Sequence, residues 1–328
     1  MTDVAVIGGG VVGTAVTLAL ARRGVETVLL EARDELASAA SGTNSGIVHT
    51  GFDSVPGELE TALIMHSAQL RDEVVEALGI PVWRCGAIVR GVEARNGVAA
   101  RRRDDGAQEI PGESITDPVH STRALAAAAE ALGAEIRTGV RVTERLDVLA
   151  VNCAGLYADD VARLYGDDSF EIYPRKGEFF AFDGIALDRI LLPTPTRRTK
   201  GVLVFPTLDG KVVAGPTAVD QTDKEDWSVR PEALGEVRAK AAELLPEIAD
   251  AEPIASWAGL RPAGRGVNYL IRRAMPELVN VAAIRSTGLT ASLGIAEHVA
   301  EMIAPGAAPG PLPHVSVPPS KEPWWRRS

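Results

Sequence analysis

Three glycines and one acidic residue near the start of the chain have the spacing of a site that binds a nucleotide diphosphate. Gly8, Gly10 and Gly13 form a Gly-x-Gly-x-x-Gly pattern. The first permits a tight turn, the second lets the backbone approach a pyrophosphate, and the third lets a helix pack closely on a sheet. Glu31 follows 18 residues after Gly13, where its carboxylate can accept hydrogen bonds from a ribose diol and would repel a 2′-phosphate. The pattern predicts a dinucleotide other than NADP.

The elements around these residues support that prediction. Residues 3–33 contain an apolar strand, the glycine turn, a helix and a second strand that ends at Glu31. In this arrangement the diphosphate lies over free N–H groups at the helix N-terminus. A glycine turn without a ligand is the alternative interpretation, and the strand, helix and acid together make it the weaker one.

Two later segments are expected to reach the same crevice. Residues 149–164 predict a strand that ends at Asn152, a turn of small residues and an amphipathic helix, and residues 278–303 predict a second strand, turn and helix. Ligands gather at the carboxyl ends of strands in an open α/β sheet. Small residues also occur wherever a helix packs tightly on a sheet, so the first turn alone leaves both interpretations open.

The remaining patterns predict an α/β fold with two domains and a tail. Alternating residues in 172–218 predict a mainly antiparallel sheet, with a helix over it at 231–245. The charged stretch 89–112 favours a solvated surface connection, and the Pro- and Gly-rich tail favours mobility over docking. We expect a discontinuous Rossmann-type domain (1–80, 114–170 and 275–304), a substrate domain (81–113 and 171–274) and a tail (305–328).

Composition narrows the class of protein. The chain has 328 residues, 46% of them hydrophobic, with a net charge of −10, which argues against a general nucleic-acid binder. Two cysteines exclude a disulfide framework and a four-cysteine metal site. With no run of 18 apolar residues and no basic leader, we expect no membrane span, no signal peptide, no bound metal and a cytoplasmic location.

A family resemblance emerges from motifs that follow one another between residues 3 and 304. They are the glycine turn, Glu31-Ala32-Arg33, TNSGIVHTGFDSVPG, NCAGLYAD, PRKGEFF, GPTA, GLRPA and IRSTGLTAS. Together they resemble the D-amino-acid-oxidase-type superfamily of FAD-dependent oxidoreductases. Within it the sequence is most similar to the glycerol-3-phosphate dehydrogenases and the L-2-hydroxyglutarate dehydrogenases or oxidases. The GPTA and IRSTGLTAS motifs are closer to the glycerol-3-phosphate branch.

The resemblance implies a noncovalent FAD that lies extended across the Rossmann-type domain. Its adenosine would lie near Glu31, Ala32 and Arg33, and its pyrophosphate over the glycine turn. Further contacts are expected at two small residues of the second turn and at residues of two loops, namely Ala154, Gly155, Ser41, Thr43, Asn44, Ser45, Gly288, Leu289 and Thr290. The segments 142–148 and 89–117 are shorter than in such flavoproteins. This shortening would remove structure that covers the substrate pocket, and it would leave the cofactor contacts in place.

Two further side chains suit the chemistry that the resemblance implies. Oxidation of a secondary alcohol needs a base for the hydroxyl proton, and His49 lies in the loop that such flavoproteins place beside the flavin. Arg261 offers a bidentate fork to a carboxylate or phosphate, with Arg265, or Arg175 and Lys176, as a second contact. A structural histidine and ordinary surface cations are the alternatives.

The functional hypothesis is an enzyme that oxidises a small anionic hydroxy compound, first of all glycerol 3-phosphate, with hydride transfer to flavin N5. An L-2-hydroxyglutarate dehydrogenase or oxidase, an amino-acid or amine oxidase, and a non-enzymatic FAD-binding subunit are the alternatives. A quinone, an electron-transfer protein and O2 remain open as electron acceptors.

Overall fold

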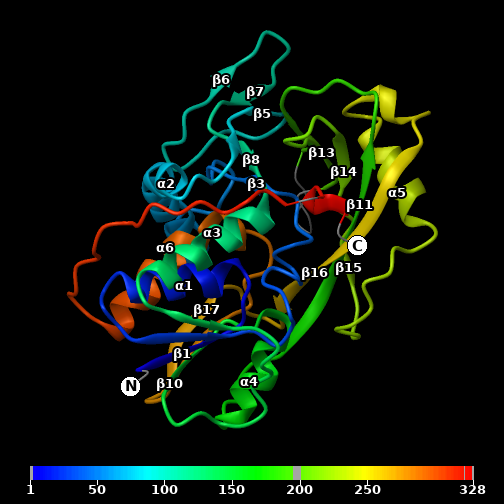
Figure 1. Cartoon of the computed structure of the whole chain (residues 1–328). Coiled ribbons are helices and arrows are strands. Elements are labelled where there is room, and N and C mark those ends of the chain that lie inside the picture. The colour runs from blue at the N-terminus through cyan, green and yellow to red at the C-terminus, as the bar shows by residue number, and fades with distance from the viewer. Residues whose placement is uncertain (1–2, 195–200, 321, 327–328) are drawn as a thin grey trace.

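The computed structural model describes residues 3–194, 201–320 and 322–326. Two sheets with helices around them form two domains (Figure 1). The predicted fold class, a Rossmann-type α/β domain with a second, mainly antiparallel domain, is confirmed.

The first domain is built on a six-stranded sheet in the order β17-β18-β10-β1-β2-β9. All neighbours are parallel except β17 and β18, which form an antiparallel pair. The strands are β1 (Val4–Ile7), β2 (Thr27–Leu30), β9 (Glu135–Arg137), β10 (Leu149–Asn152), β17 (Leu270–Met275) and β18 (Leu278–Ala282). Because β1 is central and β10 and β18 follow it, their carboxyl ends meet at one edge of the sheet.

Helices cover both faces of this sheet. Val4 and Val6 of β1 pack in a core with α1, α2, α3 and α6, whereas Ile7 packs with α4 on the other side. This alternation is what a strand buried on both faces requires. The helices are α1 (Val11–Ala21), α2 (Leu59–Ala77), α3 (Pro118–Ala131), α4 (Ala158–Leu164), preceded by η1 (Gly155–Tyr157), and α6 (Gly288–Ile303).

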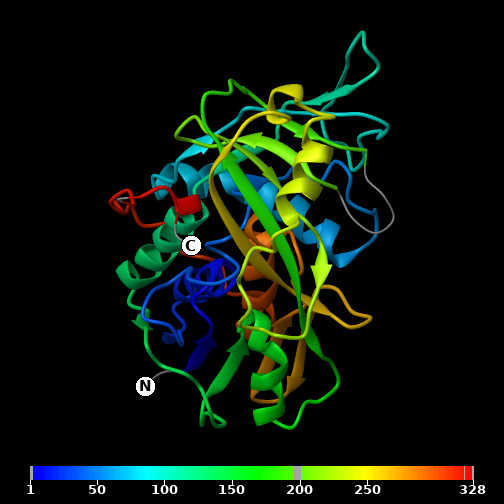
Figure 2. The ribbon, with the colours of Figure 1, turned by 90° about the vertical axis from the view of Figure 1, so that its right-hand side faces the viewer.

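The second domain is a larger sheet in the order β15-β11-β14-β13-β12-β5-β7-β6, with β16 also paired to β11. α5 (Ala233–Ala241) packs on β14 and β11, and η2 (Pro246–Ile248) follows it. The strands are β5 (Ala87–Val89), β6 (Arg101–Arg102), β7 (Gln108–Ile110), β11 (Ile172–Phe182), β12 (Ile190–Leu192), β13 (Leu203–Pro206), β14 (Val212–Gly215), β15 (Val219–Asp220) and β16 (Pro253–Gly264). In Figure 2 the long strands β11 and β16 run along both domains.

The stretch 89–112 is only in part the solvated surface connection that its charge suggested. β6 and β7 extend the second sheet through β5, and Val89 and Ile110 are buried in its core. Residues 90–106 are exposed or half-buried as predicted, whereas Val89, Gln108 and Ile110 near the ends of the stretch are buried because they belong to strands of the sheet.

A three-stranded sheet holds the loop that follows β2. β8 (Ser114–Thr116) lies between β3 (Ile47–Val48) and β4 (Val82–Trp83), with antiparallel pairing on both sides. This sheet fixes where the chain passes from β3 to His49.

The tail is docked, which contradicts its predicted mobility. Gly310 N–H donates to the Arg22 carbonyl at 2.6 Å, and Leu312 packs against the first core. In η3 (Trp324–Arg326), the exposed fractions of Trp324 and Trp325 are 4% and 1%. The many prolines and glycines obscured the decisive residues, which are two large apolar side chains at the end of the tail.

The tryptophans tie the tail to both domains. The ring of Trp324 lies edge-on to Trp257 of β16, with centroids 5.6 Å apart, and Trp257 donates from Nε1 to the carbonyl of Thr43 at 3.1 Å. Trp325 donates from Nε1 to Asp209 Oδ1 at 3.0 Å. The tail thereby joins the loop after β2 to the second sheet.

Replacement of Trp325 by alanine should lower the free energy of unfolding by about 3–5 kcal/mol, because a large buried side chain leaves a cavity. Urea denaturation of the full chain measures this loss. Leu208→Ala is the control, since Leu208 is 39% exposed and should change stability by less than about 0.5 kcal/mol. A Trp325→Ala protein as stable as the parent would show that the tail does not dock.

Candidate active site

A cavity of about 950 Å³ lies between the two domains. Its walls come from the β1–α1 turn, the loop after β2, the turn after β10, the segment 281–290, and β11 and β16. Ligand pockets usually measure about 300–1,000 Å³, so this cavity is at the upper end of that range.

The glycine turn fits a diphosphate because its backbone is too crowded for side chains. A Cβ on Gly8 would lie 2.4 Å from the Cys153 carbonyl oxygen, and one on Gly13 would lie 1.9 Å from the Gly8 carbonyl oxygen. Gly10 lines the cavity, where a Cβ would lie 2.9 Å from Ser41 Oγ. Because these three positions carry no side chains, a phosphate group can approach the backbone at the start of α1.

Glu31 lines the cavity at the end of β2 and is fixed in orientation. Its Oε2 accepts a hydrogen bond from Gly9 N–H at 2.6 Å, and its Oε1 accepts one from Arg33 N–H at 2.8 Å. The carboxylate stands beside the glycine turn, where the sequence pattern expects a ribose. Ala32 and Arg33 line the same end.

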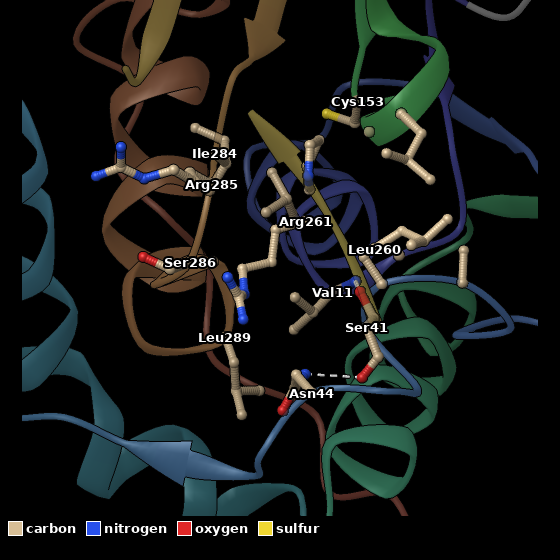
Figure 3. A pocket seen from close by; sticks show the side chains of 18 of the residues that line it. Val11, Ser41, Asn44, Cys153, Leu260, Arg261, Ile284, Arg285, Ser286 and Leu289 are labelled. Carbon is tan, nitrogen blue, oxygen red and sulfur yellow. Dashed lines mark hydrogen bonds between the residues drawn. The ribbon is translucent and has the colours of Figure 1, made fainter. Parts of the chain in front are cut away.

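The loop after β2 is organised by its own polar side chains. Ser41 Oγ accepts a hydrogen bond from Val11 N–H at 2.9 Å, and Asn44 donates from Nδ2 to the Ser41 carbonyl at 2.8 Å (Figure 3). The structure brings all the other expected cofactor contacts to this one cavity, namely Thr43, Ser45, Ala154, Gly155, Gly288, Leu289 and Thr290. Their role toward the cofactor stays a prediction.

His49 lines the cavity just after β3 and is held through its backbone and its ring. Its N–H donates to Thr290 Oγ1 at 3.1 Å, and its Nδ1 lies 2.8 Å from Glu113 Oε2. Glu113 is fully buried. Sequence reasoning missed Glu113, which lies between the surface connection it expected and the next strand; an acidic residue next to the buried Ser114–Thr116 strand was the available signal.

Burial alone would raise the pKa of Glu113, but its neighbours outweigh that effect. The charge and hydrogen bond of His49 and the two hydrogen bonds from Thr50 bring the pKa of this carboxyl below its ordinary value. Glu113 is therefore ionised at neutral pH.

Arg261 extends from β16 into the cavity toward the loop that carries Ser286 and Leu289 (Figure 3). It donates from Nη2 to the Thr217 carbonyl at 2.8 Å, and it passes so close to Gly177 that a Cβ there would lie 2.1 Å from Nη2. Burial, followed by the charges of Arg175 and Arg285, lowers the pKa of Arg261 to about 10, although Asp220 opposes the change.

The other expected anion contacts are placed differently. Arg175 lines the cavity but is paired with Asp220, with Nε 2.5 Å from Oδ1. Arg265 is not among the residues found to line the cavity, and its Nε lies 2.7 Å from Glu171 Oε2. Lys176 is buried and bound to Asp226 at 2.8 Å. Arg285, which sequence reasoning missed, does line the cavity.

Residues 3–106 and 90–302 match the protein family described as FAD dependent oxidoreductase, or DAO. The chain belongs to this family. Its cofactor is FAD, as the sequence motifs predicted, and it is an oxidoreductase.

Comparisons with individual proteins agree with this family assignment. The chain is 28% identical to a glycerol 3-phosphate dehydrogenase of Caloramator mitchellensis, over 92% of this chain and 74% of the relative. It is 24% identical to the mitochondrial L-2-hydroxyglutarate dehydrogenase of Arabidopsis thaliana, over 91% and 82%. The structure of L-alpha-glycerophosphate oxidase from Mycoplasma pneumoniae with FAD bound matches with a TM-score of 0.85 and 25% identity, over 95% of this chain and 97% of that one.

The described part of the chain was searched for membrane-spanning helices and for metal-binding groups. Within residues 3–194, 201–320 and 322–326, no helix is long and apolar enough to cross a membrane. Within the same residues, no group of three or more histidine, cysteine, aspartate or glutamate side chains is arranged to hold a metal ion.

We expect the protein to purify with FAD that is bound but not covalently attached. Acid precipitation should release the cofactor into the supernatant, where mass analysis identifies it, and the pellet should be colourless. A yellow pellet would contradict noncovalent binding.

A Gly13→Ala variant should lose FAD binding by at least about tenfold, because the added Cβ at 1.9 Å from the Gly8 carbonyl must push α1 away from the turn. Fluorescence titration of apoprotein with FAD gives the dissociation constant. Gly235→Ala is the matched control, since a Cβ at this helical glycine of α5 meets nothing within 4 Å. Equal affinity in both variants would show that close packing at Gly13 is not what forms the site.

Proposed function

We propose that this protein oxidises glycerol 3-phosphate at its secondary hydroxyl group. The observation that supports this most is the pair of arginines, Arg261 and Arg285, that line the cavity. Arg175 and Arg261 face each other across β11 and β16, and among the described residues Arg261 and Arg285 have no ion-pair partner, whereas Arg175 has Asp220. A phosphate dianion matches this unbalanced charge.

The chain's own residues would divide the work as follows. When bound, FAD supplies the hydride acceptor at N5 of its isoalloxazine ring. Arg261 holds the phosphate through its guanidinium fork and so fixes the reactive carbon in place. His49 takes the hydroxyl proton at Nε2, because its Nδ1 is engaged by Glu113.

L-2-hydroxyglutarate is the second candidate, and Arg285 is the observation that favours it. Arg285 lines the cavity as a second cation besides Arg261, so a substrate with two separated carboxylates has two partners.

O2, a quinone or an electron-transfer protein would take the electrons, and the rate of reoxidation in air separates the first from the other two. The two free cysteines, Cys85 and Cys153, fit our proposal of a reducing, cytoplasmic location, which fractionation of the source cells tests.

His49→Ala should slow flavin reduction by glycerol 3-phosphate about a hundredfold or more, because the hydroxyl proton loses its acceptor. Rapid anaerobic mixing measures the rate, with FAD content checked by absorbance. The control is His66→Ala, which changes an exposed histidine of α2. An unchanged rate in a yellow His49→Ala protein would assign His49 a structural role.

Arg261→Ala should weaken substrate binding by about 2–5 kcal/mol, since the anion loses its charge partner in the cavity. Arg261→Lys should restore only part of this, because an ammonium group cannot form the bidentate fork. Titration of each variant against the flavin spectrum gives the dissociation constants. Arg265→Ala is the control, because Arg265 pairs with Glu171. If Arg265→Ala weakened binding as much as Arg261→Ala, the assignment of Arg261 would fail.

A further inference from the structure

We propose that Glu113 is a positioning residue that fixes the tautomer of His49, so that Nε2 rather than Nδ1 carries the lone pair that faces substrate. The inference rests on the proposed role of His49 as base. It concerns a carboxylate from the turn between β7 and β8, remote in sequence from the loop that it contacts.

Among the described residues, the side-chain hydrogen bonds of Glu113 all go to two consecutive residues. Oε2 lies 2.8 Å from His49 Nδ1, while Oε1 accepts from Thr50 N–H at 2.7 Å and from Thr50 Oγ1 at 2.8 Å. Burial of a carboxylate is costly unless hydrogen bonds compensate it. Here the compensating groups belong to the segment that carries the base, so the buried charge and the orientation of His49 depend on each other.

The chemistry of the carboxylate decides the tautomer. An ionised carboxylate only accepts hydrogen bonds, so the ring nitrogen that faces it must carry a proton. In a neutral imidazole the other nitrogen then has the free lone pair. With Nδ1–H directed at Glu113, Nε2 is the nitrogen able to take a proton from a substrate hydroxyl.

The groups around Glu113 keep it charged. Arg71 of α2 donates from Nη2 to the His49 carbonyl at 3.1 Å; burial lowers the pKa of Arg71, whereas the charge of Glu113 raises it. Burial raises the pKa of Cys85 to about 11, and the charge of Glu113 adds to this, so the thiol stays neutral. Among the described residues, Glu113 therefore faces one permanent cation, one neutral thiol and the imidazole.

Glu113→Gln tests the tautomer because Thr50 determines which way the amide group of the glutamine is oriented. The backbone N–H of Thr50 can only donate, so the amide oxygen of the glutamine must face Thr50 and its NH2 group must face His49 Nδ1. That arrangement leaves the lone pair on Nδ1 and the proton on Nε2. The variant keeps the size of the side chain but reverses the tautomer.

The direct measurement is nitrogen NMR of the FAD-loaded protein labelled with ¹⁵N-histidine. The chain has only five histidines, and the spectrum of His49→Gln identifies the signals of His49. We expect the proton on Nδ1 in the parent and on Nε2 in Glu113→Gln. A parent with the proton on Nε2, or a variant with the parent's tautomer, would overturn the proposal whatever the substrate is.

Kinetics separate positioning from a merely structural role. In the Glu113→Gln variant, glycerol 3-phosphate should reduce the flavin about a hundredfold more slowly. The dissociation constant of glycerol 3-phosphate should change less than about threefold. Glu113→Asp, which keeps the charge, should recover part of the rate even where Glu113→Gln folds poorly. Glu109→Gln, four residues earlier on β7, is the control. A parent-like rate in Glu113→Gln contradicts the proposal.

The NMR measurement also separates this proposal from the proposed function. If glycerol 3-phosphate fails to reduce even the parent, the proposed function fails, while the NMR result still decides the role of Glu113.

Discussion

The repulsion between two arginines on neighbouring strands shapes the chemical end of this molecule. The register of β11 and β16 places Arg175 directly opposite Arg261, and like charges in this position destabilise a sheet. Asp220 on β15 neutralises Arg175, and Gly177 leaves room for the other guanidinium to turn into the cavity. The sheet therefore holds one cation without an ion-pair partner, Arg261, which lines the cavity.

The same cavity has two ends with different physical requirements. At the FAD end, bare backbone is needed, and the contacts of Gly8 and Gly13 with neighbouring carbonyl oxygens exclude side chains. At the chemical end, the proposed base needs a fixed orientation, and His49 is held by α6 through Thr290, by α2 through Arg71 and by the turn between β7 and β8 through Glu113. The tail packs against the second sheet, where the ring of Trp324 lies edge-on to Trp257 of β16.

The parts of this arrangement that depend on local spacing could be predicted from sequence. The glycine turn, Glu31 and the β18–α6 turn are each defined by residues close together in the chain, and the alternating strands of the second sheet follow from their own pattern. Glu113 and Arg285 could not be recognised, because their meaning depends on which distant segment packs against them. The tail was misjudged for the same reason, since only the folded chain offers Trp325 a buried position beside Asp209.

The central claim is that the cavity selects a hydroxy compound by its anionic group. Its most direct test is anaerobic mixing of the FAD-loaded protein with glycerol 3-phosphate, glycerol, L-2-hydroxyglutarate and a panel of amino acids, while the flavin absorption band is recorded. Rapid bleaching by glycerol 3-phosphate, with none by uncharged glycerol at the same concentration, is the predicted result. Equal bleaching by glycerol, or bleaching by amino acids alone, would contradict it.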